Sequence, residues 1–390
     1  MGEVGKTKSG IGFPDAQQGG KQGTPFYKVS DMNNPGNEVV MMNANNYASD
    51  SQLKENKWNP INPQNSGVVF AKVGAAIFLD RKRIVDTSFL IDNNMMSYLF
   101  DSSWNRYFGK TLFEKLRLSR FAQVGALPSF NGSDVEDIKV MIPEESEQKM
   151  IGDMFEKLDD IIALHQRKLD LLKEQKKGYL QKMFPKNGAK VPELRFAGFA
   201  DDWEQRKLGD ISYKVKEKNK TGEFTETLTN SAEYGIINQR DFFDKDISNA
   251  KNLTGYYVVK NDDFVYNPRI SNFAPVGPIK RNKLGRTGVM SPLYYVFRTH
   301  DIDKNYFEKY FDTVYWHRFM ELNGDSGARA DRFAIKDSVF VEMPIPYPTM
   351  DEQQKIGSFF KQLDDTIALH QCKLDLLKEQ KKGFLQKMFV

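Results

Sequence analysis

Cysteine is almost missing from this 390-residue sequence, and the single residue, Cys372, excludes a disulfide framework and any zinc module built on several cysteines. Only four histidines are present, which leaves little for a metal site made of several imidazoles. No run approaches the roughly 18 apolar residues of a membrane span, since the best one, 66–80, is interrupted by Lys72. The opening MGEVGKTKSGIG has no apolar segment of a signal peptide. We therefore expect a soluble, cytoplasmic protein without membrane contact.

A large excess of one charge is also absent. Lys+Arg 56 against Asp+Glu 52 leaves a net charge of +4, which excludes a histone-like polycation but permits local basic patches. The 40% hydrophobic and 13% aromatic content can fill real cores. Because 390 residues exceed one ordinary domain, the length predicts two or more domains.

An internal repeat divides the chain into two halves. The segment 147–184 recurs as 352–389, with an offset of 205 residues and 29 of 38 positions identical. Across 162–184 the match rises to 21 of 23 positions. Pro143 and Pro348 precede the two copies at the same offset. Each half is therefore a long variable stretch followed by the same short segment.

The repeated segment has the pattern of a long helix with a coiled-coil seam. Apolar residues alternate three and four apart, which is the spacing of such a seam. A helix of about 34 residues would be roughly 50 Å long. The predicted seam residues of the two copies are Phe155, Leu158, Ile162, Leu169, Leu172, Tyr179, Met183, Phe360, Leu363, Ile367, Leu374, Leu377, Phe384 and Met388.

Charge within the repeat predicts how the two helices pair. Segment 147–163 carries five acids and two bases, whereas segment 164–184 carries six bases and two acids. Packed antiparallel, the acidic end of one helix meets the basic end of the other; packed parallel, like charges would meet. The pattern therefore favours an antiparallel pair within one chain, although each charge by itself could simply be a solvated surface residue.

The two variable regions differ from the repeat in composition and pattern. They are rich in Gly, Asn, Asp and aromatic residues, and turn sequences separate short β-like runs. These runs lie at 23–29, 66–80, 255–259, 262–268 and 291–298, and short helices are expected at 102–118 and 304–322. We predict an α+β protein with pseudo-two-fold symmetry, in which two mixed α/β domains are separated by two long helices that form an antiparallel intramolecular coiled coil. The predicted parts are 1–142 and 186–347 for the domains, and 143–185 and 348–390 for the helices.

Motifs of catalysis are missing. Gly5-Lys6-Thr7 resembles part of a phosphate-binding loop, but no amphipathic helix follows it. Pro14-Asp15 with Glu55-Asn56-Lys57 matches a nuclease pattern that is too short and common to be informative. Tyr266-Asn267-Pro268-Arg269 has Arg where an adenine methyltransferase tetrad has its second proline. We expect no catalytic and no metal site on this chain.

Two histidines and the cysteine also have simpler interpretations. His165 and His370 occupy equivalent seam positions, so in an antiparallel pair they could approach each other or bind nearby polar groups. A metal or catalytic role is disfavoured because no other ligand type clusters with them. Cys372 replaces Arg167 of the first copy, which predicts an exposed position.

Several loops of both variable regions combine basic, amide and aromatic residues, a mixture that suits DNA. Arg and Lys bind guanine and phosphates, while Asn and Gln bind adenine. Each such residue could equally be an ordinary surface residue, and the set as a whole is what favours DNA. The candidate DNA-binding residues are Lys28, Ser30, Asp31, Lys72, Arg81, Lys82, Arg83, Arg120, Gln123, Gln239, Arg240, Asn267, Arg269, Asn272, Lys280, Arg281, Arg329 and Arg332.

The organisation resembles the specificity subunit of Type I restriction–modification systems over the whole chain. The most specific motifs are the repeat, VPELRFAGFADDWEQRKLGDI at 191–211, and GARADRFAIKDSVFVEMPIPYPTMDEQ at 327–353. The resemblance implies two target-recognition domains that each read one part of a bipartite, asymmetric DNA site. It also implies that the spacer helices set the gap between the two parts and bind two methyltransferase subunits. S-adenosylmethionine, ATP and Mg would then belong to partner subunits, including motor-nuclease subunits, and none to this chain.

The resemblance also suggests which segments face DNA. Segment 28–33 is matched to 237–242, 70–75 to 265–270, and 120–133 to 325–336. The motif at 191–211 has no counterpart ahead of Met1, and Met1-Gly2-Glu3-Val4 aligns with Leu208-Gly209-Asp210-Ile211. This departure leaves open whether the first half begins short or is truncated, and it concerns the opening of the first domain.

Two other classes of function stay open at this point. A coiled-coil adaptor that binds proteins would show no salt dependence of DNA affinity, whereas a DNA-binding subunit would show a log–log slope of several units. A free-standing nuclease or methyltransferase is opposed by the missing motifs.

Overall fold

The computed structural model describes residues 1–122, 127–186, 188–242, 250–325 and 331–389. The contacts divide the chain into two compact units. The first unit comprises Met1–Leu169 and His370–Val390, and the second comprises Asp170–Leu369. Both boundaries fall inside the long helices of the repeat, so each unit contains one variable region and a piece of each helix.

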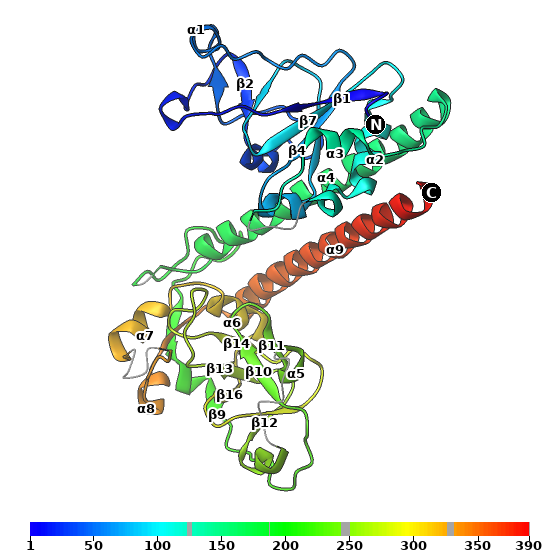
Figure 1. Cartoon of the computed structure of the whole chain (residues 1–390). Helices are drawn as coiled ribbons and strands as arrows, with labels where there is room; N and C mark the ends of the chain where they lie inside the picture. The colour runs from blue at the N-terminus through cyan, green and yellow to red at the C-terminus, as the bar shows by residue number, and fades with distance from the viewer. Residues whose placement is uncertain (123–126, 187, 243–249, 326–330, 390) are drawn as a thin grey trace. The chain divides into compact units, whose positions relative to one another are not determined.

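A four-stranded antiparallel sheet in the order β1-β7-β4-β5 forms the centre of the first unit (Figure 1). The strand β4 is buried along its whole length, which explains why its sequence is continuously apolar instead of alternating. Two helices, α2 and α3, pack against this sheet, and β3-β2-β6 form a smaller sheet. The elements are β1 (Gly5–Ser9), β2 (Thr24–Tyr27), β3 (Tyr47–Ala48), α1 (Asp50–Glu55), β4 (Gly67–Ala71), β5 (Lys82–Val85), β6 (Leu90–Ile91), β7 (Met95–Phe100), α2 (Arg106–Leu116) and α3 (Gly132–Glu136).

The second unit contains a sheet of the same kind, in the order β9-β16-β13-β14. Its middle strand β13 is also fully buried, so both variable regions are built on one scaffold. Three two-stranded pairs, β10-β11, β12-β15 and β17-β8, complete the strands. The elements are β8 (Glu204–Lys207), β9 (Ser212–Lys214), β10 (Leu228–Ser231), β11 (Gly235–Asn238), α5 (Gln239–Phe242), β12 (Tyr257–Val259), β13 (Phe264–Tyr266), β14 (Ile279–Arg281), β15 (Gly288–Met290), β16 (Tyr295–Thr299), α6 (Lys304–Phe311), α7 (His317–Asn323), α8 (Asp337–Phe340) and β17 (Pro344–Tyr347).

One predicted helix is interrupted. The segment 304–322 forms α6 and α7 instead of a single helix, because the chain turns between Phe311 and His317. There the Asp312 carboxylate accepts a hydrogen bond from Lys309, and Trp316 is buried against Phe311 with ring centroids 5.5 Å apart. Asp312 also accepts from Lys280 at 3.0 Å, and this partner lies far away in the sequence, so the local sequence does not reveal it.

Both copies of the repeat form one long helix each, α4 (Glu145–Lys182) and α9 (Met350–Met388). Glu145 and Glu147 in the first turn of α4 complement the positive end of the helix dipole. The prediction of two long helices alternating with two mixed α/β domains is therefore confirmed.

Within the first unit, the two helices run antiparallel. Phe155 of α4 lies near Phe389, the residue that follows the end of α9, with ring centroids 6.3 Å apart. Further along α4, His165 lies near His370, and their Nδ1 atoms are 3.1 Å apart. Residue numbers therefore rise on one helix as they fall on the other. Burial, followed by the positive charge of Lys373 and the neighbouring His370, lowers the pKa of His165.

The second unit repeats the antiparallel arrangement with the other ends of the helices. Lys176 Nζ lies 2.7 Å from Asp364 Oδ1, and the rings of Tyr179 and Phe359 meet edge to face at 5.1 Å. A basic C-terminal half of one helix thus lies against an acidic N-terminal half of the other. This is the pairing that the charge pattern of the repeat predicts.

The predicted seam differs from the structure at one end. Phe384 and Met388 are 40% and 37% exposed, so their assignment to the seam is wrong. There Leu385 and Phe389 pack on the core of the first domain instead, and this contact replaces the helix–helix seam. The buried predicted residues are Phe155, Leu169, Leu172, Met183, Phe360 and Leu374, and the half-buried ones are Leu158, Ile162, Tyr179, Leu363, Ile367 and Leu377.

A buried ionic cluster connects the helix pair to the domain in the first unit. Asp159 of α4 accepts from Lys110 of α2 (2.5 Å) and pairs with Lys381 of α9 (2.7 Å). Glu114 of α2 pairs with both lysines at 2.8 Å. Burial alone would raise the pKa of Glu114, but the two ammonium groups outweigh it and lower this pKa to about 2.

The same cluster recurs in the second unit. Asp364 lies 2.7 Å from both Lys309 of α6 and Lys176 of α4, and Asp312 pairs with Lys309 at 2.9 Å. Asp159 and Asp364 are the same position of the repeat, as are Lys176 and Lys381. The same aspartate and the same lysine of the repeat therefore attach each domain. In each unit the aspartate comes from one long helix and the lysine from the other.

A buried glutamine makes a second repeated attachment. Gln148 Oε1 accepts from the backbone N–H of Asn105, and Gln353 Oε1 accepts from that of Asp303, both at 2.9 Å. Asn105 and Asp303 are the N-caps of α2 and α6. Each long helix thus fixes the N-terminus of one domain helix, so the two domains are held in equivalent ways.

Candidate functional site

In the first domain, the end of β4 lies beside the last loop of the domain. The Phe130 N–H donates to the Lys72 carbonyl at 3.3 Å, and the Gly74 N–H donates to the Pro128 carbonyl at 2.8 Å. Two of the segments predicted to face DNA, 70–75 and 120–133, are thereby brought together. The contact places the half-buried Lys72 next to this loop.

The second domain makes the equivalent junction at the end of β13. The Phe333 N–H donates to the Pro268 carbonyl at 2.8 Å, and the Ile270 N–H donates to the Asp331 carbonyl at 3.1 Å. The backbones of Arg269 and Arg332 form an antiparallel bridge. The junction therefore places two arginines from distant parts of the sequence side by side.

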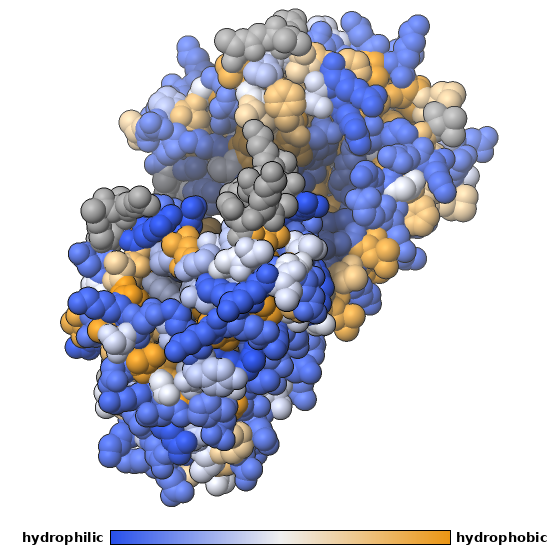
Figure 2. Space-filling model, turned by 90° about the horizontal axis from the view of Figure 1, so that it is seen from below, coloured by the Kyte–Doolittle hydropathy of each residue, from blue (hydrophilic) through white to orange (hydrophobic). Residues whose placement is uncertain are grey.

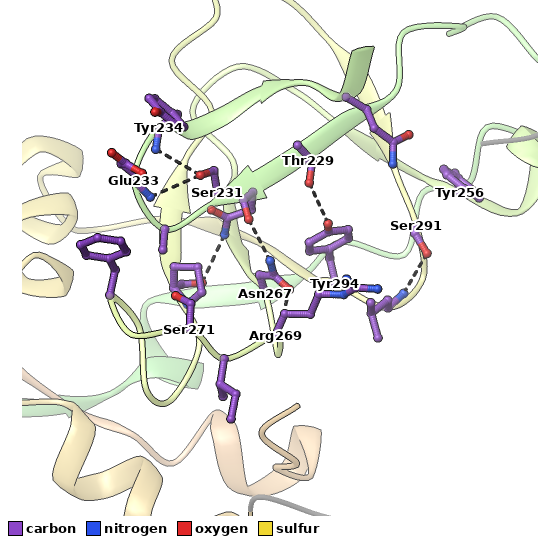
Figure 3. A pocket seen from close by; sticks show the side chains of 17 residues that line it. Thr229, Ser231, Glu233, Tyr234, Tyr256, Asn267, Arg269, Ser271, Ser291 and Tyr294 are labelled. Atoms are coloured by element: carbon purple, nitrogen blue, oxygen red, sulfur yellow. Dashed lines mark hydrogen bonds between the residues drawn. The ribbon is translucent and has the colours of Figure 1, made fainter. Parts of the chain in front are cut away.

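A pocket of about 530 Å³ opens next to Arg269 (Figure 3). Ser231 Oγ accepts from the N–H groups of Glu233 and Tyr234, and Thr229 Oγ1 lies 3.0 Å from the hydroxyl of Tyr294. The lining residues are Thr229, Asn230, Ser231, Ala232, Glu233, Tyr234, Gln239, Tyr256, Asn267, Arg269, Ile270, Ser271, Phe273, Pro278, Ser291, Leu293 and Tyr294. Hydroxyl, amide, guanidinium and aromatic groups are the types that bind bases and phosphates.

Two buried asparagines line this pocket. Asn267 Nδ2 donates to the Asn230 carbonyl at 2.8 Å, and its Oδ1 accepts from the Arg269 N–H at 3.0 Å. Asn230 Nδ2 donates to the carbonyls of Val265 and Pro278, while Asn230 Oδ1 is buried without a partner among the described residues. Asn267 therefore positions the backbone of Arg269 with both of its polar groups, and its role as a base contact stays a prediction.

The corresponding part of the first domain is basic and apolar. Arg117 and Arg120 are exposed, at and beside the turn η4 (Leu118–Phe121). Phe121 and Phe78 are also exposed, at 40% and 63%. Arg117 was not predicted from the sequence. Its left-handed backbone, with φ of 48°, ends α2 and turns the chain toward this surface.

The predicted DNA contacts of Asp31 and Lys82 are also wrong. Asp31 is fully buried and accepts from the backbone N–H groups of Lys28 and Asn45, at 2.6 and 2.9 Å. Lys82 is 1% exposed and binds the carbonyl and carboxylate of Asp80. Both side chains stabilise the first domain from within, since a buried charge needs such partners.

The remaining predicted residues differ in their partners and in their exposure. Basic residues with hydrogen-bond partners include Lys28 with Gln18, Arg81 with Asn33, Arg83 with the carbonyls of Lys82 and Met32, Lys280 with Asp312, and Arg281 with Asp262. The exposed ones are Ser30, Arg120, Arg240, Arg269 and Asn272, and the half-buried ones are Lys28, Lys72, Arg81, Arg83, Gln239, Lys280, Arg281 and Arg332. Gln123 and Arg329 lie outside the described residues.

The sequence-based selection missed the aromatic rim of the pocket. Phe273 is 77% exposed and Tyr234 is 63% exposed, and both line the opening. Aromatic residues inside turn sequences, as in Ser271-Asn272-Phe273, are the signal that could have identified them. Exposed rings of this size next to polar groups mark a binding surface.

Within the described residues, no cluster of three His, Cys, Asp or Glu side chains could hold a metal ion. None of the described helices is both long and apolar enough to cross a membrane. The space-filling view shows a face that is mostly hydrophilic, with small hydrophobic patches (Figure 2).

Comparison with known proteins identifies the family. The model of the Type I restriction modification DNA specificity domain matches residues 1–174 and 200–379. The model matches twice because the chain contains two domains with the same scaffold, each followed by one copy of the repeated helix. The chain belongs to the family of Type I restriction–modification specificity subunits.

Similar curated proteins come from Methanocaldococcus jannaschii. The putative type I restriction enzyme MjaX specificity subunit is 25% identical over 277 residues, which cover 66% of this chain and 60% of the relative. The type I restriction enzyme MjaVIII specificity subunit is 22% identical over 330 residues, which cover 79% of this chain and 74% of the relative. The chain thus spans less than two thirds of the first relative.

Solved structures share the fold. The crystal structure of a Type-I restriction-modification system S subunit from M. genitalium superposes with a TM-score of 0.61 at 11% identity, covering 100% of this chain and 94% of that one. A chain from a study of complex assembly and conformational transition of the type I R-M system gives a TM-score of 0.50 at 14% identity, covering 99% and 95%. The architecture is therefore retained at low sequence identity.

Proposed function

We propose that this chain is the DNA-reading subunit of a Type I restriction–modification complex. The domain 1–142 reads one part of a bipartite, asymmetric DNA site, and the domain 186–347 reads the other. The helices 143–185 and 348–390 set the gap between the two parts, so the separation of the half-sites follows from geometry.

One observation carries the proposal: both domains present a junction of the same construction but with different side chains. At the equivalent backbone bridge the first domain has Val73 opposite Ser129, next to Lys72, and the second has Arg269 opposite Arg332. Different side chains at equivalent positions are what two domains that read different sequences require.

Exposed residues of the two long helices also favour two equivalent binding sites for methyltransferase subunits. In the first unit Leu164 of α4 and Leu376 of α9 are 62% and 58% exposed. In the second unit the same two positions of the repeat, as Leu369 of α9 and Leu171 of α4, are 68% and 52% exposed. Exposed leucines repeated in this way favour one copy of the same partner in each unit.

The chain itself performs no chemistry under this proposal. The methyltransferase subunits would bind S-adenosylmethionine and take the target adenine out of the stack, and motor-nuclease subunits would use ATP and Mg. This chain contributes phosphate and base contacts through the residues on its two junctions.

The test is adenine-methylation mapping of genomic DNA after co-expression of this chain with a methyltransferase subunit. The expected result is a single split motif with a fixed gap that disappears when this chain is omitted. Association of the two proteins without any methylation that depends on this chain would contradict the proposal.

DNA binding of the purified complex gives an independent check. If phosphates are contacted by several basic groups, the logarithm of the affinity falls with the logarithm of the salt concentration with a slope of about −0.9 for each phosphate neutralised. An affinity independent of salt would instead support a protein-binding adaptor.

A further inference from the structure

The connection between a central strand and the edge strand of the main sheet carries an exposed phenylalanine in both domains. In the first domain β4 pairs with the edge strand β5, and Phe78 lies in the connection 72–81. In the second domain β13 pairs with the edge strand β14, and Phe273 lies in the connection 267–278. The two rings thus occur at corresponding places of the fold, although the sequences around them differ.

In the first domain a short helical turn directs Phe78 toward solvent. The connection forms η3 (Ala75–Leu79), and its residue Ile77 is buried in the core of the domain. The Asp80 N–H donates to the Ile77 carbonyl at 3.0 Å and closes the turn. Because Ile77 anchors the turn from within, the next two side chains, Phe78 and Leu79, are exposed, at 63% and 58%.

In the second domain a tight turn directs Phe273 toward solvent. Ser271 and Ala274 exchange two backbone hydrogen bonds of 3.1 and 3.0 Å, so that Asn272 and Phe273 form the tip of the turn. Ala274 and Val276 are buried and anchor this turn to the domain. Both rings are therefore held on fixed turns before a partner binds, which lowers the conformational entropy lost on binding.

Exposed arginine side chains accompany both rings. Phe273 lines the same pocket as the exposed Arg269. In the first domain η3 packs against η4, where Arg117 and Arg120 are exposed. Exposed cations beside an exposed ring match a partner that combines negative charge with flat apolar faces, and the phosphates and bases of DNA provide both. The charge therefore favours DNA over an apolar protein surface as the partner of these rings.

We propose that each ring inserts beside a base of the half-site that its domain contacts and partly unstacks one base step. This inference rests on the proposed function, because each domain must bind one part of the DNA site. Apolar side chains that enter a duplex in this way unstack the neighbouring bases and bend the DNA. Recognition then depends also on how easily that step is deformed, which favours flexible steps such as TA or CA/TG at the two positions.

The test uses the complex of the full chain with methyltransferase subunits, and duplexes that carry the motif found by methylation mapping. The fluorescence of the base analogue 2-aminopurine rises when it unstacks, and the analogue is placed at one position of a half-site at a time. Outside the methylated adenine, we expect one step of raised fluorescence in each half-site. Phe273→Ala should abolish the rise in one half-site and Phe78→Ala in the other, whereas Phe273→Trp and Phe78→Trp should retain it.

The salt dependence of affinity separates the ring from the arginine. Phe273→Ala should weaken DNA binding by about tenfold or more. The salt slope should stay unchanged, because a neutral ring displaces no counterions from the phosphates. Arg269→Ala should reduce this slope by about 1. Val314→Ala shortens another exposed apolar side chain of the same domain and should change neither affinity nor slope.

The outcomes distinguish this inference from the proposed function. If no motif depends on this chain, the proposed function fails and the inference fails with it. If the motif is methylated but Phe78→Ala and Phe273→Ala leave the fluorescence unchanged, the inference alone is wrong. Normal DNA affinity of Phe273→Ala together with loss of a methyltransferase subunit would also overturn it, because the ring would then bind protein.

Discussion

Asp159 holds two ammonium groups where the long helices meet the first domain. Lys110, one of the two, is almost fully buried. We predict that Asp159→Asn lowers the free energy of unfolding by about 3–5 kcal/mol, because it removes half of the countercharge of a buried lysine. Urea unfolding followed by circular dichroism measures the effect.

The matched control is Asp153→Asn, which removes an exposed carboxylate from the same helix. Its effect should stay within about 0.5 kcal/mol. Equal losses for the two variants would show that the buried cluster does not contribute to stability.

The same cluster predicts a dependence of stability on acid. The pKa of Glu114 is lowered from 4.5 to about 2, since its two lysine partners outweigh its burial. A carboxylate with a depressed pKa stabilises the fold above its unfolded pKa, and this contribution is lost as the pH falls through its folded pKa. We predict that the unfolding midpoint in urea falls between pH 4.5 and 2.

In Glu114→Gln the titrating group is gone, so the decline over this pH range should be shallower, although the variant starts from lower stability. A wild-type curve that is flat between these pH values would refute the assignment. In the second unit, burial by itself would raise the pKa of Asp364, but the positive charges of Lys309 and Lys176 outweigh burial and lower it. Both units should therefore become less stable in acid.

At the scale of the element, two adjacent leucines of α4 allow the pairing of the two long helices to be tested separately from the docking of partner subunits. Leu172 is 6% exposed and Leu171 is 52% exposed. We predict that Leu172→Asp disrupts the helix pair and thereby the binding of partner subunits, because a charge cannot be buried unpaired in the seam. Circular dichroism and co-purification with the methyltransferase subunit measure the two effects.

Leu171→Asp is the matched variant. It should leave the helix content and the unfolding midpoint unchanged while it weakens binding of one methyltransferase subunit, measured by native mass spectrometry. If Leu172→Asp still forms the full complex, the seam assignment is wrong. If Leu171→Asp binds two copies normally, the exposed leucines are not the docking residues.

At the scale of the whole molecule, the two domains are built on one scaffold and attached by equivalent contacts. We predict that exchanging residues 1–142 for the corresponding domain of another specificity subunit changes only one part of the methylated motif. Methylation mapping of the hybrid gives the answer directly. A change in both parts would show that the domains do not read DNA independently.

The limits of sequence-based prediction follow from what each signal measures. The seam was predictable because a period of three and four residues reports on one helix face, yet it failed at Phe384 and Met388, where a domain core replaces the partner helix. The choice of DNA contacts failed at Asp31 and Lys82 because residue type does not reveal burial. Arg117 and Phe273 were missed because only the folded chain brings Arg117 to the exposed surface beside η4 and Phe273 to the rim of the pocket.

The sequence by itself determined the repeat, the two long helices, their antiparallel pairing and the alternation with two mixed domains. These features follow from periodicity and charge, which act between neighbours along a helix and are readable in one dimension. Only the tertiary structure decided which polar side chains stabilise the interior and which reach the two junctions. It also decided that Asp159 and Asp364 serve as equivalent anchors. The physical reason is that burial and pairing of charges depend on contacts between residues far apart in the chain.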